Sequence, residues 1–440
     1  MQYCLSNWHG CIRLRWKGLL LSLVAVSLFL PRIGFSADGL TVKFIDESHS
    51  GHEVYVAFGG QTNPAKLVGG IIGGKNLELG TSYSLADLNP GIHLTRFDGR
   101  ICIALGSPFH SVSPETGNNP NFNNPSLPDF DIRWDKAEIT YDVNDPFSTI
   151  NLSATDFFSV RLRIRTYHAG KLVTTLTWQK GIATAFRDTG LLSGFSRLSR
   201  FSDGAVCLGD FGVPTLKSID PPEFVRVLRV ISPSSTIREF NFNPYPSFED
   251  YTNFVRRNAI TTKIEGKFLG QPAATYEFTA LIDSAGGLVM IGTITTNSVP
   301  QSHVILISDA ELNKGIYTAD PLCNIDGKYE HPGSTAFGAA VRDALAGFSY
   351  GFIGSKEPNP NAPGLTFGQS ASDQWYTPPL PISYAFAGAQ PHTLYYNQYA
   401  SVLARITDAY GFPYSDLVKK PLASLNPAEA DTVEITILAD

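Results

Sequence analysis

Two acidic residues, Glu138 and Asp156, lie in segments whose polar and apolar residues alternate as in β-strands. In residues 136–141, Glu138 falls on the polar side of the alternation. In residues 150–162, Asp156 falls among the apolar side chains. A carboxylate in an apolar row is unfavourable unless it is paired, hydrogen-bonded or functional, and burial raises its pKa. The segment therefore offers a candidate pair of acid–base groups.

The two segments are expected to form a hairpin around the turn residues Asn144-Asp145-Pro146. One register of this hairpin places Glu138 opposite Asp156. Glycoside hydrolysis needs two such carboxyl groups, because one protonates the leaving oxygen while the other activates water or attacks carbon. This register joins a polar face to an apolar face, so a bulge or a one-residue shift must intervene. Spacing alone also allows an exposed Glu138 and an Asp156 that caps a turn.

Motifs of other reaction classes are incomplete or absent from the sequence. Residues 69–76 approach a phosphate-binding loop, but Asn76 replaces the Ser or Thr that would hold magnesium, so a Gly-rich β turn is favoured. The sequence has no G-x-S-x-G elbow, no H-E-x-x-H motif and no Cys–His metal spacing. His52 and His93 are expected at strand ends or turns. We expect no metal and no cofactor.

The N-terminal segment 1–37 has the layout of a secretory signal peptide, although an uncleaved anchor is the alternative. Basic residues precede a short apolar run, Leu19–Leu30, and small residues follow it. Export to the periplasm or the medium is expected, with no stable membrane association after cleavage. This segment carries four basic and no acidic residues, so a net charge of −6 for the whole chain becomes −10 without it. Such a charge disfavours nucleic acid and is compatible with neutral carbohydrate.

The cysteines that follow the signal segment do not form a disulfide scaffold. Only Cys102, Cys207 and Cys323 remain, which allows one disulfide at most. Buried structural thiols are the expected state of these residues.

The composition indicates a mainly β protein. Glycine (39) and proline (29) are abundant, charged residues make up only 17%, and short apolar runs alternate with turn signals. Asp98-Gly99 is predicted to form a hairpin-type turn. The expected strands are Glu53–Phe58, Arg100–Leu105, Lys136–Tyr141, Ser159–Arg165, Leu172–Trp178, Thr275–Leu281, Leu288–Thr295, His303–Ile307 and Thr432–Leu438.

Helices and long loops complete the expected organisation. Apolar residues recur at helical spacing in three segments of the second half, 247–257, 335–348 and 396–410, and Ser247 is a plausible N-cap. Residues 111–131 and 355–363 are rich in Asn and Pro, which indicates long surface loops of the kind that often form binding rims.

Residues 131–142 (DIRWDKAEITYD) resemble the catalytic strand of family-64 glycoside hydrolases, the thaumatin-like β-1,3-glucanases. In that family the Glu of this strand is followed some 16–18 residues later by an Asp before Phe-Phe, and the segment Asn151–Phe158 (NLSATDFF) is similar. Further similar elements span most of the mature chain in the family's order, namely Val54-Tyr55-Val56, Asp98–Ile101, a helix near Phe248, an Ala-rich helix near Ala339, and Tyr410–Asp416.

The resemblance implies a thaumatin-like β-barrel or sandwich domain beside a mixed α/β domain, with a wide groove between them. Residues 38–220 with 401–440 would form the β domain, and residues 221–400 would form the mixed domain. The implied activity is endo-acting, inverting hydrolysis of β-1,3-glucan by a monomer without a cofactor.

The resemblance also implies a role for each residue that matches the family's motif. Glu138 would be the general acid and Asp156 the general base. Three polar residues of the groove, Thr140, Asn151 and Ser153, would bind sugar hydroxyls. Trp134 would stack on a sugar ring, although a buried Trp is the alternative.

The sequence departs from the family pattern in two places. Ser159-Val160-Arg161 replaces a Gly-Leu-Pro-like run after Asp156, and Ser415 replaces the first Asp of a Tyr-Asp-Asp-like element. Two interpretations therefore compete with an enzyme. One is a non-catalytic glucan-binding protein of the same fold, and the other is an exported interaction protein without a sugar site.

Overall fold

A computed structural model describes residues 39–60, 71–72, 75–110, 120, 122, 128–180, 229–240, 243, 245–376, 385–386, 391, 394–417 and 421–439. The predicted signal segment 1–37, the thiol of Cys207 and most of the predicted loop 111–131 lie outside these ranges. Within them, no helix is both long and apolar enough to span a membrane.

The chain divides into two compact units, which we call the β unit and the mixed unit. The β unit comprises residues within 33–245 and 402–440, and the mixed unit is Pro246–Ser401. Residues 229–245, which we expected in the mixed domain, belong to the β unit because a short strand there, β13 (Val230–Ile231), pairs with β10 (Phe157–Phe158). The predicted groove between the domains stays a prediction.

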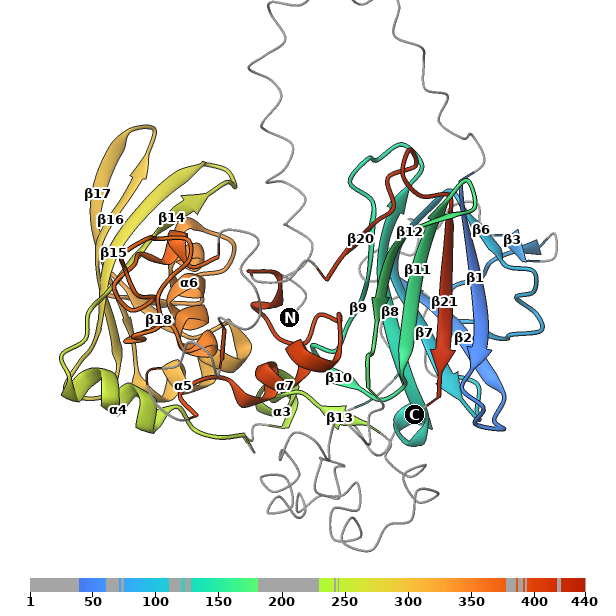
Figure 1. The fold of residues 1–440 in the computed structure, drawn as a ribbon, viewed down its shortest axis with the longest axis horizontal. Coiled ribbons are helices and arrows are strands. Elements are labelled where there is room, and N and C mark those ends of the chain that lie inside the picture. The colour runs from blue at the N-terminus through green and yellow to red at the C-terminus, as the bar shows by residue number, and fades with distance from the viewer. Residues whose placement is uncertain are drawn as a thin grey trace, which may run out of the picture. The chain divides into compact units, whose positions relative to one another are not determined.

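The β unit consists mainly of two sheets that form adjacent layers (Figure 1). One is a seven-stranded sheet, ordered β12 (Lys171–Thr177), β11 (Leu162–His168), β21 (Thr432–Leu438), β1 (Leu40–Glu47), β6 (Ile92–Leu94), β3 (Ile71–Ile72) and β4 (Lys75–Asn76). The other is six-stranded, ordered β20 (Ala423–Ser424), β9 (Thr149–Leu152), β8 (Arg133–Asp142), β7 (Arg96–Leu105), β2 (Val54–Gly60) and β5 (Ser82–Ser84).

The inner faces of the two sheets form the core of the β unit. Alternate residues of β7, including Phe97 and Ile101, are buried together with Phe58 of β2. Phe58 contacts Phe97 within its own sheet and Phe44 of the seven-stranded sheet, with ring centroids 6.1 and 6.3 Å apart. Because side chains alternate along a strand, the residues between these core positions lie on the opposite, outer face. This outer face carries Glu138.

Two of the predicted turns behave differently in the structure. The Asp98-Gly99 turn is wrong, because both residues lie inside β7, where Asp98 pairs with Thr140 and Gly99 with Ile139. In the Gly-rich segment 69–76, β3 and β4 pair antiparallel, while the glycines of the predicted turn lie outside the described residues.

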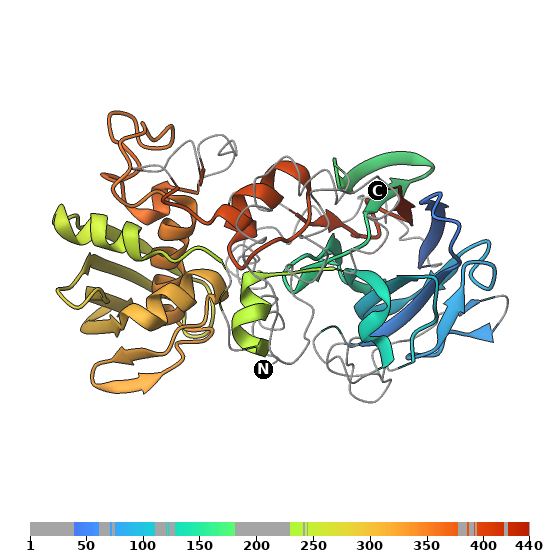
Figure 2. The same ribbon diagram turned by 90° about the horizontal axis from the view of Figure 1, so that it is seen from below.

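The mixed unit contains a six-stranded antiparallel sheet with helices packed on one face (Figures 1 and 2). Its strands are β14 (Thr262–Phe268), β15 (Ala274–Ile282), β16 (Leu288–Thr296), β17 (Val299–Ile307), β18 (Cys323–Ile325) and β19 (Lys328–Glu330). Its main helices are α4 (Glu249–Arg257), α5 (Asp309–Thr318) and α6 (Ala336–Tyr350). α7 (Gln398–Ile406) starts in this unit and ends in the β unit.

The three predicted helical segments correspond to α4, α6 and α7, whereas α5 and the short helix α3 (Pro233–Phe240) were not predicted. The N-cap of α4 is Phe248 rather than Ser247, although Ser247 Oγ accepts a hydrogen bond from Glu249 N at 3.1 Å. The predicted loop 355–363 has no regular element, and its backbone is fixed by hydrogen bonds such as Asn359 N to Leu365 O (2.9 Å).

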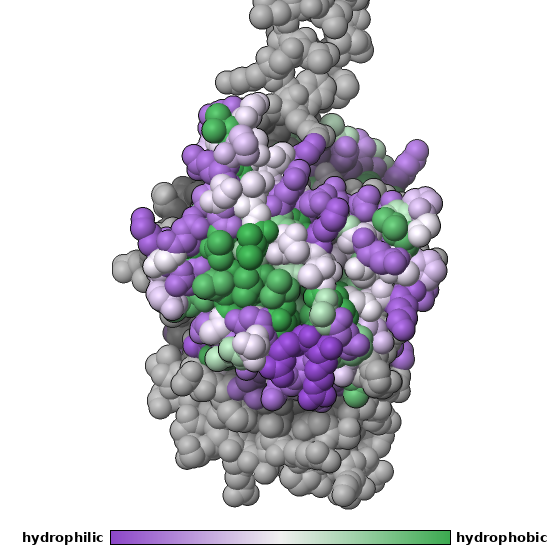
Figure 3. Space-filling view, turned by 90° about the vertical axis from the view of Figure 1, so that its left-hand side faces the viewer, coloured by the Kyte–Doolittle hydropathy of each residue, from purple (hydrophilic) through white to green (hydrophobic). Residues whose placement is uncertain are grey.

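The other face of the mixed unit's sheet exposes aliphatic side chains. Ile291 of β16 pairs with Val304 of β17, and these side chains are 55% and 38% exposed, while Leu306 is 40% exposed. A green patch of apolar side chains is visible on this side of the molecule (Figure 3).

Candidate active site

A row of polar side chains crosses the outer face of the six-stranded sheet of the β unit. The row follows the pairing of three neighbouring strands, in which Arg100 of β7 lies opposite Glu138 of β8, and Glu138 lies opposite Asn151 of β9. One pair further along, Asp98 lies opposite Thr140, and Thr140 Oγ1 donates to Asp98 Oδ1 at 3.0 Å. The alternation predicted for residues 136–141 is thus confirmed, with Ala137 and Ile139 in the core.

Glu138 is held by a charged hydrogen-bond donor from the neighbouring strand. Arg100 Nε donates to Glu138 Oε1 at 3.1 Å, and Arg100 Nη2 lies 3.1 Å from the same oxygen. Among the described residues, no donor contacts Glu138 Oε2. The side chain as a whole is 11% exposed.

Asp156 does not lie on a strand opposite Glu138, which corrects the predicted register. The β8–β9 pairing places Asn151 opposite Glu138, and β9 ends at Leu152. Asp156 follows in a bend before β10, so residues 150–162 are not one alternating strand. Ser232 fixes this bend, because its N–H donates to Asp156 O (2.8 Å) and its Oγ donates to Thr155 O (2.5 Å).

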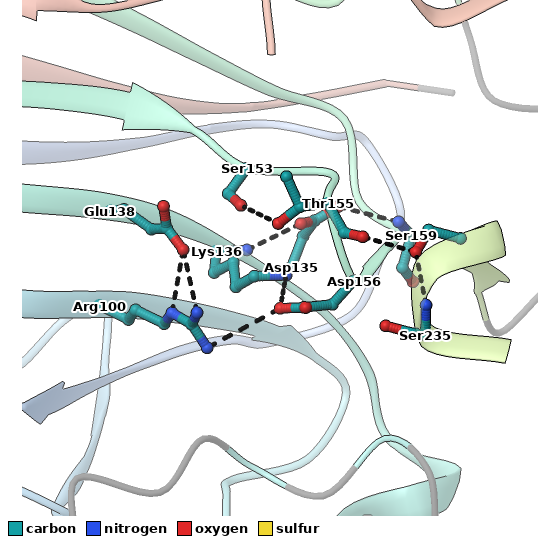
Figure 4. A network of polar contacts seen from close by, with 10 residues as sticks. Arg100, Asp135, Lys136, Glu138, Ser153, Thr155, Asp156, Ser159 and Ser235 are labelled. Carbon is teal, nitrogen blue, oxygen red and sulfur yellow. Dashed lines mark hydrogen bonds and ion pairs between the residues drawn. The ribbon is translucent and has the colours of Figure 1, made fainter. Parts of the chain in front are cut away.

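The bend nevertheless brings Asp156 to the same guanidinium group as Glu138 (Figure 4). Arg100 Nη1 lies 3.8 Å from Asp156 Oδ2, while Nη2 lies 3.1 Å from Glu138 Oε1. Because a guanidinium group is compact and planar, these contacts limit the separation of the two carboxylate oxygens to roughly 9 Å. The two acids therefore share one site.

Positive charge around Asp156 determines its protonation. Lys136 Nζ lies 3.4 Å from Asp156 Oδ2, in addition to Arg100. Partial burial raises the pKa of Asp156, but Lys136 and then Arg100 outweigh it, so that the pKa of Asp156 is lowered from its ordinary value. The raised pKa that the sequence suggested for Asp156 is therefore wrong, because nearby positive charge outweighs burial, and Asp156 is a carboxylate suited to accept a proton.

Arg100 is the site residue that the motifs did not assign. Burial lowers its pKa, but Glu138 and Asp156 outweigh this effect and the pKa of Arg100 is raised. A charged residue in an alternating strand has the pattern of any solvent-facing position. Only the pairing of β7 with β8 shows that Arg100 lies beside an acid, so the sequence carries no local signal for it.

Trp134 is not available to stack on a sugar, and this prediction is wrong. Its side chain is fully buried in an apolar cluster on the outer face of the sheet. Its ring contacts Phe109 and Phe157 edge-on, with centroids 5.8 and 4.7 Å away. The cluster closes one end of the polar row, so Trp134 supports the strand that carries Glu138.

The three predicted sugar-binding residues lie close to the two acids in the strand order. Thr140 and Asn151 share the outer face with Glu138, and both are half-buried. The buried Oδ1 atom of Asn151 has no hydrogen-bond partner among the described residues. Ser153 is buried in the bend, where its Oγ lies 3.1 Å from Thr155 Oγ1 (Figure 4).

The residues that depart from the family pattern have structural partners here. Ser159 N and Val160 N donate to Asp135 Oδ2 at 2.8 and 3.1 Å, so this run is fixed to β8 through a buried carboxylate. Burial raises the pKa of Asp135 to about 6, against the lowering effect of Lys136 and of these hydrogen bonds. Ser415 Oγ accepts hydrogen bonds from Gly411 N (3.1 Å) and Phe412 N (3.0 Å) within its own turn.

The remaining candidate groups carry no competing chemistry. His52 precedes β2, as predicted for a strand end, but His93 lies inside β6. No cluster of metal-binding side chains occurs in the described ranges. Cys102 and Cys323 are buried free thiols, and burial raises the pKa of each to about 12.

Solved structures with the same fold are β-1,3-glucanases. One is a laminaripentaose-producing β-1,3-glucanase in complex with laminaritetraose, with a TM-score of 0.51, 15% sequence identity, and coverage of 91% of this chain and 98% of that chain. Another is a β-1,3-glucanase domain (GH64) from Clostridium beijerinckii, with a TM-score of 0.52, 14% identity and the same two coverages.

Sequence comparisons gave no further relatives, since neither a family model nor a curated protein matches the chain. The structural likeness extends over nearly the whole chain at low identity, and it shows a mainly β fold similar to that of GH64 laminaripentaose-producing β-1,3-glucanases.

Proposed function

We propose that this chain is an endo-β-1,3-glucanase that hydrolyses its substrate with inversion, using Glu138 as general acid and Asp156 as general base. The observation that carries the proposal is the contact of one guanidinium group, that of Arg100, with both carboxylates on one sheet face. The upper limit of roughly 9 Å on their separation is compatible with the 6.5–9.5 Å typical of inverting pairs. The fold of the similar glucanases supports the substrate class.

The two carboxylates have environments that suit different roles. Arg100 contacts only Oε1 of Glu138, so Oε2 is the oxygen from which a proton would pass to the leaving glycosidic oxygen. As the bond from that oxygen to C1 breaks, water attacks C1 from the opposite side of the ring. Asp156, held ionised by Lys136 and Arg100, accepts the proton that this water loses. Proton exchange with solvent then returns Glu138 to its protonated form and Asp156 to its carboxylate form.

The surrounding polar residues supply the proposed sugar contacts. Thr140 and Asn151 are half-buried next to Glu138 on the outer face, and we assign their side chains to contacts with sugar hydroxyls. Ser153 lies in the bend that carries Asp156, so we assign it to shaping the bend as well as to binding. We further propose that the β unit is thaumatin-like, and that the protein is exported and acts as a monomer without a cofactor.

Product analysis on a linear β-1,3-glucan tests the proposal. Wild-type protein should release short oligosaccharides whose new reducing ends have inverted configuration, as followed by NMR during the first minutes of reaction. Glu138→Gln should reduce turnover by about 10²–10⁴-fold while glucan binding is retained, because only the proton donor is lost.

Asp156→Asn should also abolish turnover, since an amide does not accept a proton from water. A wild-type protein that binds the glucan and releases no sugar would instead identify a glucan-binding protein. Retention of configuration would contradict the assigned role of Asp156.

A further inference from the structure

Lys136 is a lysine with an unusual location, on the outer face of β8 between Trp134 and Glu138. Its side chain is fully buried. Its Nζ lies 4.2 Å from the centroid of the Phe157 ring and 6.0 Å from that of Trp134. The ammonium group therefore sits against the apolar cluster rather than in solvent.

Burial of an ammonium group is unfavourable unless the charge is compensated. Among the described residues, Asp156 is the carboxylate within ion-pair distance of Lys136, with Oδ2 at 3.4 Å, and no conventional hydrogen bond to Nζ is formed. The aromatic faces contribute only a weaker cation–π attraction. A methionine would fill the same space at no electrostatic cost, so packing alone does not account for a lysine here.

We propose that Lys136 is a positioning residue whose buried ammonium group keeps Asp156 ionised and fixes its carboxylate in the site. This inference rests on the proposed function, in which Asp156 is the general base. Lys136 acts only through Asp156, since its side chain is not exposed to a substrate.

The other charged groups around Asp156 do not replace Lys136. Arg100 on β7 lies farther away, with 3.8 Å between Nη1 and Oδ2, and it is shared with Glu138. Arg238, exposed on α3 (Pro233–Phe240), makes a weaker contribution in the same direction. Among these groups Lys136 lowers the pKa of Asp156 the most, which agrees with its shorter distance and its burial.

Two further titratable groups lie close to Lys136 in the sheet, one on its own strand and one on the neighbouring strand. Asp135 precedes it on β8, points to the opposite face of the sheet and accepts hydrogen bonds from Ser159 and Val160. Cys102 lies opposite Lys136 on β7, and burial raises the pKa of its thiol to about 12, so it is neutral. Neither group carries a positive charge that could replace that of Lys136 beside Asp156.

The test is the pH profile of kcat/KM for Lys136→Met on a linear β-1,3-glucan. Loss of the positive charge raises the pKa of Asp156, so the acidic limb of the profile should move to higher pH by about one unit or more. Phe109→Leu is the control, because it loosens the same apolar cluster without changing a charge and should leave the limb in place. An acidic limb of Lys136→Met that coincides with that of wild type would overturn the proposal.

A direct titration separates this inference from the proposed function. The ¹³C carboxyl signal of Asp156, assigned with Asp156→Asn, should titrate in wild-type protein below the ordinary value of about 3.9. A value at or above 3.9 would overturn the role of Lys136, whether or not Lys136→Met folds. Absence of hydrolysis by wild type together with a depressed titration would refute the proposed enzyme and leave the electrostatic role of Lys136 intact.

Discussion

At the scale of single residues, Arg100 links the two acids into one site. Its guanidinium group contacts Glu138 through two nitrogens and Asp156 through a third, which a planar fork of donors can do and a single ammonium cannot. The two acids come from different segments, one on β8 and one in the bend after β9. Arg100 therefore defines their relative position as well as their charge.

Arg100→Lys should reduce kcat by about 100-fold, because a misplacement of about 1 Å between reacting groups has effects of that size. The variant keeps the positive charge, so a loss of activity reports on geometry. Measurement of kcat and KM on a linear β-1,3-glucan checks this expectation.

Arg96→Lys provides a matched control on the same strand and the same face. Arg96 is exposed and pairs with Asp142 at 3.5 Å, away from the two acids, so its replacement should change kcat little. Equal effects of the two substitutions would show that Arg100 has no special role.

The sequence pattern identified the two acids, but it did not identify the residues that hold them in place. Glu138 was found because alternation assigns it to a polar face, and pairing with Arg100 agrees with that assignment. Trp134 was misassigned because a Trp on the polar side of an alternating strand can either face solvent or belong to a second, smaller core. Only the tertiary contacts with Phe109 and Phe157 distinguish the two cases.

At the scale of secondary structure, the decisive element is the bend that carries Asp156. The segment after β9 leaves the sheet, and Ser153 bridges to Tyr410 instead of continuing the β8–β9 ladder. Alternation in residues 150–162 comes from three short strands, β9, β10 and β11, that belong to three different sheets. Periodicity cannot reveal such interruptions, which explains why the predicted register was wrong.

Some strands were predicted closely, although β1 and β14 were not predicted and β17 starts four residues before the predicted His303–Ile307. β21 has the predicted bounds, Thr432–Leu438, and β15 and β16 differ from prediction by a residue at their ends. These strands alternate without a break, so the hydrophobic pattern alone defines them. Asp98-Gly99 was misread because a dipeptide that favours turns lies within a ten-residue strand, where its pairing with β8 overrides local preference.

Ser232→Ala should lower both stability and turnover, because Ser232 has two functions. Its Oγ accepts a hydrogen bond from Ser235 N (3.1 Å) as the cap of α3, and it donates to Thr155 O in the bend. Loss of a cap destabilises by about 1 kcal/mol, and a looser bend should lower kcat by up to about tenfold. Thermal unfolding and kcat measure the two effects separately.

Ser247→Ala separates the effect of a hydrogen bond lost at the start of a helix from an effect on the bend. Ser247 Oγ accepts from Glu249 N at the start of α4 in the mixed unit, so its loss should affect stability and leave kcat unchanged. A Ser232→Ala protein with wild-type kcat would show that the bend keeps Asp156 in place without this hydroxyl.

At the scale of the whole molecule, the proposed chemistry belongs to one unit. The acids, Arg100 and Lys136 all lie in the β unit, with Asp156 in a bend and the other three on strands that pack against the core between its two sheets. The mixed unit has its own core, formed by the inner face of its sheet and by α5 and α6. The outer face of that sheet, with its exposed aliphatic side chains (Figure 3), contains none of these residues.

Ile291→Lys combined with Val304→Lys should therefore leave hydrolysis unchanged. The two residues face each other across β16 and β17 and are 55% and 38% exposed, so lysines there remain in solvent. Surface substitutions of this kind usually change the free energy of unfolding by less than roughly 0.5 kcal/mol, so the double variant should stay folded, with a kcat/KM close to that of wild type. Binding of a hydrophobic dye should decrease, because the patch is the exposed aliphatic surface of this sheet. A large loss of kcat/KM in a folded double variant would instead place this face on the path of the polysaccharide, and the proposed chemistry would then depend on both units.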